Sequence, residues 1–334
     1  MPGPLHREIT VATTEVEPVA VAAGASEFAY SVVVPVYNSE GVVGSTVDRI
    51  LAFFEATGLR HQLVLVNDGS TDGSWAVIAD RARRDPRVVA LDLLRNYGQH
   101  RANLAGFREA TGDFVITMDD DLQNPPDQIL PLIAKAMEGH DVVFGRYQRK
   151  RAPWHRRWGS GLITLVNRRV FNQPPDLTVS NFRILRREVV DRICRSRTAH
   201  PYVTGQALLY CRNPADVLVR HEPRTVGASG YTLPRILRLV MTILFSYSLW
   251  PLRVAALTGF VVTALSFLLG SVYLARAWFV DSPVEGWTTL VVLLSFLGGC
   301  IIALLSMVGE YLIRILDAMN SQEAYHVAER VSGP

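Results

Sequence analysis

The chain has 334 residues, which is enough for one large domain and an appendage. Its formal net charge is only +3, from 34 basic and 31 acidic residues, so the overall charge says little about partners. We expect no nucleic-acid partner. The three cysteines, Cys194, Cys211 and Cys300, lack metal-ligand spacing, which argues against a zinc site and indicates free thiols in a reducing compartment.

Strand-like apolar runs alternate with helical patterns along the first part of the chain. Residues 1–28 show no periodicity and carry Glu15 and Glu17 in their only mildly apolar part, so we expect a disordered tail and no signal peptide. Strands are then predicted at 31–36, 62–66, 88–94, 113–118 and 142–144, and helices at 42–54, 75–83, 101–110 and 127–137. This alternation predicts an α/β fold with a doubly wound, mostly parallel sheet, whose ligand lies beyond the carboxyl ends of the strands.

Two uncharged apolar stretches near the C-terminus predict transmembrane helices. Residues 254–275 and 288–309 are each about 22 residues long, roughly 33 Å as a helix, which is enough to cross a bilayer. The loop between them is short, so the pair should form a hairpin. Its loop carries one arginine, whereas four flank the outer ends: Arg235, Arg238, Arg253 and Arg314. The positive-inside rule therefore places the large N-terminal part in the cytosol, on a multi-pass protein of the cytoplasmic (inner) membrane.

Two further segments are typical of helices that lie in the membrane interface. Residues 154–171 mix two tryptophans with arginines and aliphatic side chains, and residues 231–251 end at a Trp-Pro pair before the first span. An ordinary surface helix of the sheet domain is the alternative for 154–171.

A cluster of carboxylates follows the strand predicted at 113–118. In an extended strand, Asp119 and Asp121 share a face while Asp120 points away, so Asp120 is expected on the solvated surface. Gln123 adds a neutral oxygen two residues later. Paired carboxylates at the carboxyl end of a strand suit a hard divalent cation that also holds a diphosphate. The alternative is an acidic turn without a ligand, because turns favour aspartate.

Four motifs in this order resemble a known family: SVVVPVYN, VNDGSTDGS, RNYGQHRANLAGF and MDDDLQNPP. They are similar to family 2 glycosyltransferases of the GT-A fold, and within these to the polyprenyl-phosphate glycosyltransferases, which include dolichol-phosphate mannose synthase and undecaprenyl-phosphate glucosyl and formamido-arabinosyl transferases. The resemblance covers residues 31 to about 320. It implies a cytosolic catalytic domain at 29–230, an interfacial helix at 231–251, two transmembrane helices within 252–316, and a cytosolic C-terminal tail at 317–334.

The resemblance also implies the residues of the site. The nucleotide sugar would contact Pro35, Tyr37, Asn38, Asp68, Arg95, Asn96, Gly98 and Asp119. Mg²⁺ or Mn²⁺ would be bound by Asp121 and Gln123, with Asp119 beside it. Catalytic roles would fall to Asp119, Asp121, Arg146 and Arg224, and the acceptor phosphate would meet Arg146, Arg149, Arg183, Arg224 and Ser229.

Some of these roles have alternatives. Gly98 either allows close backbone approach to the ligand or starts a helix. The basic segment that carries Arg146 and Arg149 faces phosphates, anionic lipid headgroups, or both. His221 is left out of the site. At Gly230 the chain departs from the family, since relatives usually have lysine there, and one cation of the acceptor-phosphate site is lost.

The expected reaction is an inverting transfer of a sugar from a nucleotide sugar, with UDP favoured, to polyprenyl phosphate at the cytosolic membrane face. An acceptor phosphate with a second pKa near 6 is already mostly dianionic, so no general base is needed. The alternatives are a GDP-mannose-dependent polyprenyl-phosphate mannose synthase, a processive polysaccharide synthase, and a non-catalytic membrane scaffold. The processive synthase would need more spans and a Gln-x-x-Arg-Trp motif, which the sequence lacks. Whether the chain forms a homo-oligomer is left open.

Overall fold

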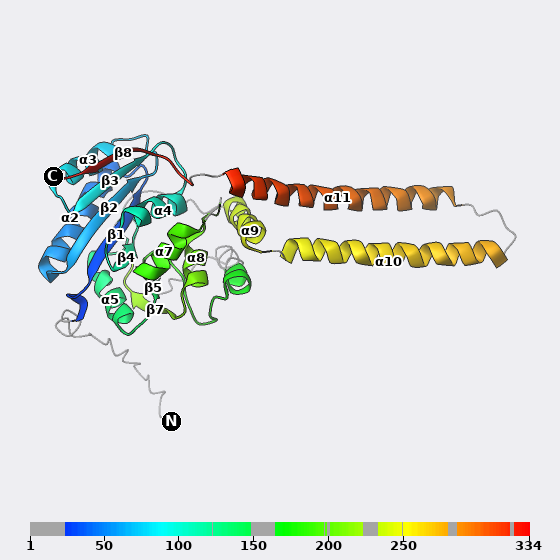
Figure 1. The fold of residues 1–334 in the computed structure, drawn as a ribbon, viewed down its shortest axis with the longest axis horizontal. Coiled ribbons are helices and arrows are strands. Elements are labelled where there is room, and N and C mark those ends of the chain that lie inside the picture. The colour runs from blue at the N-terminus through cyan, green and yellow to red at the C-terminus, as the bar shows by residue number, and fades with distance from the viewer. Residues whose placement is uncertain are drawn as a thin grey trace, which may run out of the picture.

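The alternating apolar runs form the strands and helices of one sheet domain, followed by three long helices (Figure 1). The computed structural model describes residues 24–121, 123–147, 164–196, 198, 201–222, 233–248, 250–279, 286–320 and 324–334. The strands are β1 Ala29–Val36, β2 Arg60–Asn67, β3 Val88–Leu93, β4 Phe114–Thr117, β5 Val142–Tyr147, β6 Arg183–Arg186, β7 Pro214–Val219 and β8 Val327–Ser332. The helices of the sheet domain are α2 Glu40–Thr57, α3 Ser74–Arg84, α4 Gln99–Glu109, η1 Pro126–Gln128, α5 Ile129–Met137, the helix at 164–171, α7 Arg187–Arg195 and α8 Val203–Tyr210.

The strands pair in the order β7-β5-β6-β4-β1-β2-β3-β8. Neighbours in the run β4-β1-β2-β3 are parallel, so the carboxyl ends of these four strands meet at one edge of the sheet. β6 runs antiparallel to both β4 and β5, and β7 is parallel to β5. The α/β sheet was predicted, whereas the antiparallel strands β6 and β8 were not.

Helices cover both faces of the sheet, which is why its central strands are apolar on both sides. On one face, Val33 of β1 packs in a core with side chains of α4, α7 and α8. On the other, Val32 and Val34 pack with side chains of α2, α3 and α5. The doubly wound arrangement expected from the sequence is therefore confirmed.

Both ends of the described chain belong to this domain. Before β1, Ala25 is buried, and its carbonyl oxygen accepts a 3.0 Å hydrogen bond from the hydroxyl of Tyr30. The packed chain thus begins before residue 29, where the predicted tail ends; residues 1–23 of that tail lie outside the described residues. After the last long helix, β8 pairs antiparallel with β3, with Val89 opposite Ser332. Residues 327–332, expected in a separate tail, form the last strand of the sheet instead.

Three helices extend from the sheet domain: α9 Leu233–Tyr247, α10 Trp250–Phe279 and α11 Trp287–Asn320. α10 and α11 lie side by side and project away from the sheet (Figure 1). The described residues contain one helix that is long and apolar enough to cross a membrane, with its most apolar window at Phe296–Ile313 in α11. The second predicted span, 254–275, falls within α10, and the two-span hairpin stays a prediction.

The two predicted interfacial segments differ in how much of them is described. α9 occupies most of 231–251. Of 154–171, residues 154–163 lie outside the described residues, and 164–171 are helical. Phe171, in the described part, is buried and its ring lies 5.1 Å from that of Tyr247 in α9. This part of the segment therefore packs between the sheet domain and α9.

Candidate active site

Four loops leave the carboxyl ends of the parallel strands β1, β2, β3 and β4 and meet at one edge of the sheet. They comprise residues 37–39, 68–73, 94–98 and 118–125, with residue 122 outside the described set. Each contains residues that the sequence predicted for the site. The sheet therefore brings the motifs together, as the position of ligand sites in open α/β sheets leads one to expect.

The first loop is locked to the second by Asn38. Its φ of 51° lies in the left-handed region, which asparagine tolerates better than most residues. The side-chain oxygen of Asn38 accepts a 2.9 Å hydrogen bond from the backbone N–H of Thr71, and the N–H of Asn38 donates to the hydroxyl of Ser70 at 3.0 Å. Pro35 is buried in β1, while the Tyr37 side chain is 49% exposed and available to a ligand.

Asp68 joins the second loop to the third. Its carboxylate accepts hydrogen bonds from the backbone N–H groups of Tyr97 at 2.7 Å and Gly98 at 2.9 Å. Burial raises the pKa of Asp68, and these two hydrogen bonds act in the opposite direction. The residue predicted to bind the base thus already positions the loop that carries Arg95 and Asn96.

Gly69 allows the second loop to approach the backbone of the third loop closely. Its φ is +65°, and an added Cβ would lie 2.4 Å from the backbone carbonyl carbon of Arg95 and from the nitrogen of Asn96. Only glycine satisfies both conditions. Gly98 has φ +90° directly before α4, and no atom in the described part of the chain lies within 4 Å of an added Cβ. It therefore starts the helix and also leaves open space beside the loop, so both of its predicted roles remain compatible with the structure.

The acidic loop holds its three carboxylates in different ways. Asp119 accepts a 2.5 Å hydrogen bond from the side-chain amide of Gln99, whose oxygen accepts one from Asn181 at 3.1 Å. Burial raises the pKa of Asp119 to about 6, and the negative charges of Asp121 and Asp120 add to this. Neither Gln99 nor Asn181 was singled out from the sequence, because their role depends on a contact between distant segments.

Asp120 does not behave as the solvated residue that the strand pattern predicted. Its carboxylate accepts a 3.3 Å hydrogen bond from the backbone N–H of Tyr37, and its carbonyl oxygen accepts one from the hydroxyl of Thr46 at 2.8 Å. β4 ends at Thr117, so the two-residue alternation no longer applies at Asp120. Asp120 holds the acidic loop against the loop after β1.

The oxygen atoms of Asp121 and Gln123 are the natural ligands for a hard cation. Asp121 also accepts a 3.1 Å hydrogen bond from the backbone N–H of Gln123, a local turn that keeps the two side chains on one short segment. Within the described residues no three His, Cys, Asp or Glu side chains form a complete metal cage. The oxygen atoms of Asp121 and Gln123 nevertheless fit Mg²⁺ or Mn²⁺, since such ions commonly bind one or two carboxylates together with water and substrate phosphates.

The predicted arginines are spread out. Arg146 is about half exposed at the end of β5, with its Nε 3.9 Å from a carboxylate oxygen of Asp216. Arg183 in β6 is fully buried, and its Nη1 donates a 2.7 Å hydrogen bond to Thr204. Among the described residues, its buried Nε and Nη2 have no hydrogen-bond partner, and burial lowers its pKa to about 10. The other three predicted acceptor residues, Arg149, Arg224 and Ser229, lie outside the described residues, as does Gly230.

The chain that leads towards these residues lies against the acidic loop. The ring of His221 lies 4.4 Å from that of Tyr147, and the backbone N–H of Glu222 donates a 2.9 Å hydrogen bond to the carbonyl oxygen of Gln123. His221 was left out of the site on sequence grounds, and the structure places it beside the site through this ring contact.

Comparison with known proteins agrees with this geometry. Residues 31–194 match the family model for glycosyl transferase family 2. An uncharacterized glycosyltransferase of Bacillus subtilis is 31% identical over 89% of this chain and 93% of its own length. An undecaprenyl-phosphate 4-deoxy-4-formamido-L-arabinose transferase of Proteus mirabilis is 31% identical over 90% and 93% of the two chains.

Among solved structures, a glucosyl-3-phosphoglycerate synthase from Mycobacterium tuberculosis, in complex with Mn²⁺, UDP and phosphoglyceric acid, has a similar fold. Its TM-score is 0.51 at 20% identity, over 69% of this chain and 80% of that one. Fold, motifs and the near-complete coverage of the relatives agree, and the chain therefore belongs to glycosyl transferase family 2, a family of enzymes.

Proposed function

We propose that the protein transfers a sugar from a UDP-sugar to a polyprenyl phosphate, with inversion, at the cytosolic face of a membrane. The relatives named as undecaprenyl-phosphate 4-deoxy-4-formamido-L-arabinose transferases support this acceptor class, because the similarity extends over 93% of their length. The observation that carries the proposal is the hydrogen bond from Glu222 to Gln123. It joins the acidic loop to the segment that continues into α9 and the long apolar helices.

The donor would lie across the four loops. The exposed ring of Tyr37, the Pro35 end of β1 and Asn38 would contact the nucleoside from one side, and Asp68 with the loop 94–98 from the other. Asp121 and Gln123 would hold Mg²⁺ or Mn²⁺ near the diphosphate, with Asp119 beside them. When bound, the cation offsets the negative charge that develops on the departing nucleoside diphosphate.

The acceptor phosphate needs placement and charge stabilisation, since it is already mostly dianionic at neutral pH. In this proposal, Arg146, Arg149, Arg183, Arg224 and Ser229 would supply cations and donors around it. The acceptor oxygen would attack the anomeric carbon from the side opposite the diphosphate, forming the new C–O bond as the old one breaks. This displacement inverts the anomeric configuration.

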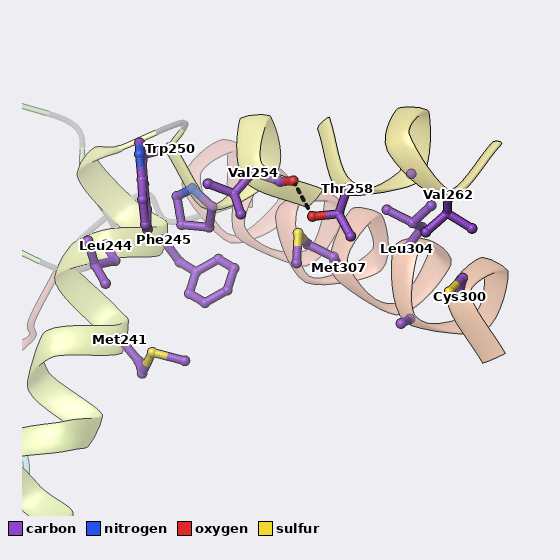
Figure 2. A pocket seen from close by; sticks show the side chains of 13 residues that line it. Met241, Leu244, Phe245, Trp250, Val254, Thr258, Val262, Cys300, Leu304 and Met307 are labelled. Carbon is purple, nitrogen blue, oxygen red and sulfur yellow. Dashed lines mark hydrogen bonds between the residues drawn. The ribbon is translucent and has the colours of Figure 1, made fainter. Parts of the chain in front are cut away.

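An apolar cavity could hold part of the isoprenoid chain of the acceptor. A cavity of about 470 Å³ lies between α9, α10 and α11, lined by residues that include Met241, Phe245, Trp250, Leu304 and Met307 (Figure 2). The backbone N–H of Tyr202 donates a 3.1 Å hydrogen bond to the hydroxyl of Tyr247, which ties α9 to the sheet domain. An isoprenoid segment in this cavity would therefore be held close to the catalytic domain.

The membrane orientation rests on the arginine distribution and on the apolar window of α11. In this proposal, α10 and α11 both span the membrane and the sheet domain faces the cytosol. A cysteine placed at Ser282 should then react with an impermeant label from outside intact cells. Labelling only after permeabilisation would indicate the opposite orientation of the protein in the membrane.

The function is tested by offering a panel of radiolabelled UDP- and GDP-sugars to the full chain in membranes with polyprenyl phosphate. We expect lipid-extractable label from a UDP-sugar, dependent on added polyprenyl phosphate. Label from GDP-mannose alone would favour the mannose synthase alternative. Label in a polymer that does not extract into lipid solvent would favour a processive synthase.

A further inference from the structure

The C-terminal segment 324–332 contacts both elements that flank the loop 94–98. β8 pairs with β3, which enters the loop, and the backbone N–H of Leu94 donates a 3.0 Å hydrogen bond to the carbonyl oxygen of His326. The loop's first residue is therefore fixed by the C-terminal segment, from the side opposite Asp68.

The same segment also holds the far end of α4, the helix that leaves this loop. Tyr325 is buried, and the guanidinium carbon of Arg108 lies 5.2 Å from the centre of its ring. The Nε of Arg330 lies 3.0 Å from a carboxylate oxygen of Glu109, the last residue of α4. Two consecutive residues at the end of α4 are thus tied to the C-terminal segment.

α4 and β3 both reach the donor site directly. Gln99, the first residue of α4, donates to Asp119, and Asp92 of β3 accepts a 2.7 Å hydrogen bond from the side chain of Asn67, next to Asp68. A shift of α4 along its axis would therefore move Gln99, and a shift of β3 would move the loop that Asp68 holds. The C-terminal segment restrains both shifts.

We infer that residues 324–332 are a positioning element of the nucleotide-sugar site, which sets the geometry of the loop 94–98 and ties it to the end of α11. The inference rests on the proposed function insofar as this loop meets the donor. Its acting residues are Tyr325 and Arg330, neither of which touches the substrate. Only three residues separate Asn320, the end of α11, from Ala324, so the apolar helix leads almost directly into this element.

The test compares the full chain in nanodiscs with Tyr325→Ala, Tyr325→Phe and the matched control Glu329→Gln, an exposed position in β8 of the same segment. Tyr325→Ala should raise the donor KM and the Kd for UDP with Mn²⁺ by about fivefold to tenfold, with the acceptor KM unchanged. Tyr325→Phe keeps the ring beside Arg108 and should stay near the parent, as should Glu329→Gln. If donor and acceptor KM change together, or only the active fraction falls, the segment is merely structural and the inference is wrong.

Hydrogen exchange on the nucleotide-free protein separates this inference from the proposed function. In Tyr325→Ala, the amides of Leu94, Tyr97 and Gly98 should exchange about tenfold faster than in the parent, whatever nucleotide the enzyme uses. Unchanged exchange there would overturn the inference even if the sugar transfer is confirmed. If Tyr325→Ala does not fold, Arg330→Ala, which removes the side-chain contacts to Glu109 and to Ser332 of the same strand, should speed the exchange of the same amides by about twofold to threefold. Unchanged exchange in Arg330→Ala would likewise count against the inference.

Discussion

The backbone N–H of Glu222 donates a 2.9 Å hydrogen bond to the carbonyl oxygen of Gln123. This bond holds Glu222, the last described residue before 223–232, at the acidic loop, although Glu222 and Gln123 are far apart in the sequence. Arg224 follows two residues later. Arg224 is therefore only two positions along the chain from a residue that is held at the acidic loop.

Arg224→Ala should depress transfer to polyprenyl phosphate while leaving nucleotide binding nearly unchanged. A charge-assisted contact to phosphate contributes about 1.5–3 kcal/mol, or roughly tenfold to a hundredfold in rate. The matched control is Arg220→Ala, an exposed arginine paired with Asp127, which should have little effect. Titrations of UDP binding and of lipid-dependent turnover on each variant measure this. A loss of UDP affinity in Arg224→Ala would assign the residue to the donor site instead.

Asp121→Ala should abolish transfer and Mn²⁺-dependent UDP binding, because it removes the proposed carboxylate ligand. EDTA should do the same to the parent, with recovery on adding Mn²⁺ or Mg²⁺. Asp80→Asn, at an exposed ion pair with Arg84, is the matched control and should behave as the parent. Full activity of the parent in EDTA would contradict the metal assignment.

Gly69→Ala should destabilise the protein and raise the donor KM. Gly58→Ala is its control, since Gly58 has the same φ of +65° but no atom of the described residues within 4 Å of an added Cβ. The left-handed backbone alone should cost each variant about 1–2 kcal/mol, and the collision with the loop 94–98 should cost Gly69→Ala about 1–3 kcal/mol more. Thermal midpoints and donor KM for both variants check this. Equal behaviour of the pair would show that the close approach of the two loops is not needed.

Arg183→Met should keep or raise the thermal midpoint and yet reduce turnover by at least about tenfold. A buried arginine whose Nε and Nη2 have no hydrogen-bond partner in the described part of the chain is costly, and an apolar side chain of similar size is often neutral or stabilising in such a place. Arg183 and Asp119 interact electrostatically, so the change also alters the charge balance of the acidic loop. Circular dichroism melting and steady-state turnover give the two readouts. A much lower midpoint together with lost activity would make Arg183 a structural residue.

His100 should make the fold sensitive to acid. Burial lowers its pKa to about 4, and the positive charge of Arg183 acts in the same direction. In the unfolded chain the imidazole takes up a proton near pH 6.5, whereas folded His100 does so only near pH 4. Stability should therefore fall as the pH drops through this window, by about 1–3 kcal/mol from this residue. His100→Phe should flatten the dependence of the thermal midpoint on pH between 4.5 and 7, and an unchanged slope would contradict the assignment.

The sequence was informative where the chemistry is local. Buried parallel strands are continuous apolar runs, so β1 to β4 and their loops could be placed within a few residues, and the acidic loop followed from its position after β4. The family motifs are specific because they occur in one order, and the comparisons confirm the family.

What could not be predicted depends on contacts between distant segments. β6 is only four residues long and has an arginine at each end, and β8 is mostly exposed, so neither strand shows a continuous apolar run in the sequence. Asp120 turns inward because β4 ends three residues earlier than the predicted alternation requires. Gln99 acts on Asp119 through tertiary packing, for which a single sequence carries no signal.

The pairing of residue 89 with residue 332 has a consequence for how the protein is made. β3 is translated long before β8, and both long apolar helices lie between them in the chain. Until β8 arrives, β3 presents an unpaired row of backbone N–H and C=O groups, the kind of strand edge that recruits other chains. A fragment that ends at Glu222 would keep this edge open for good and should self-associate. Completion of the sheet is thus delayed until both apolar helices have been synthesised, so the enzyme finishes folding only after the helices that we propose to span the membrane have been made.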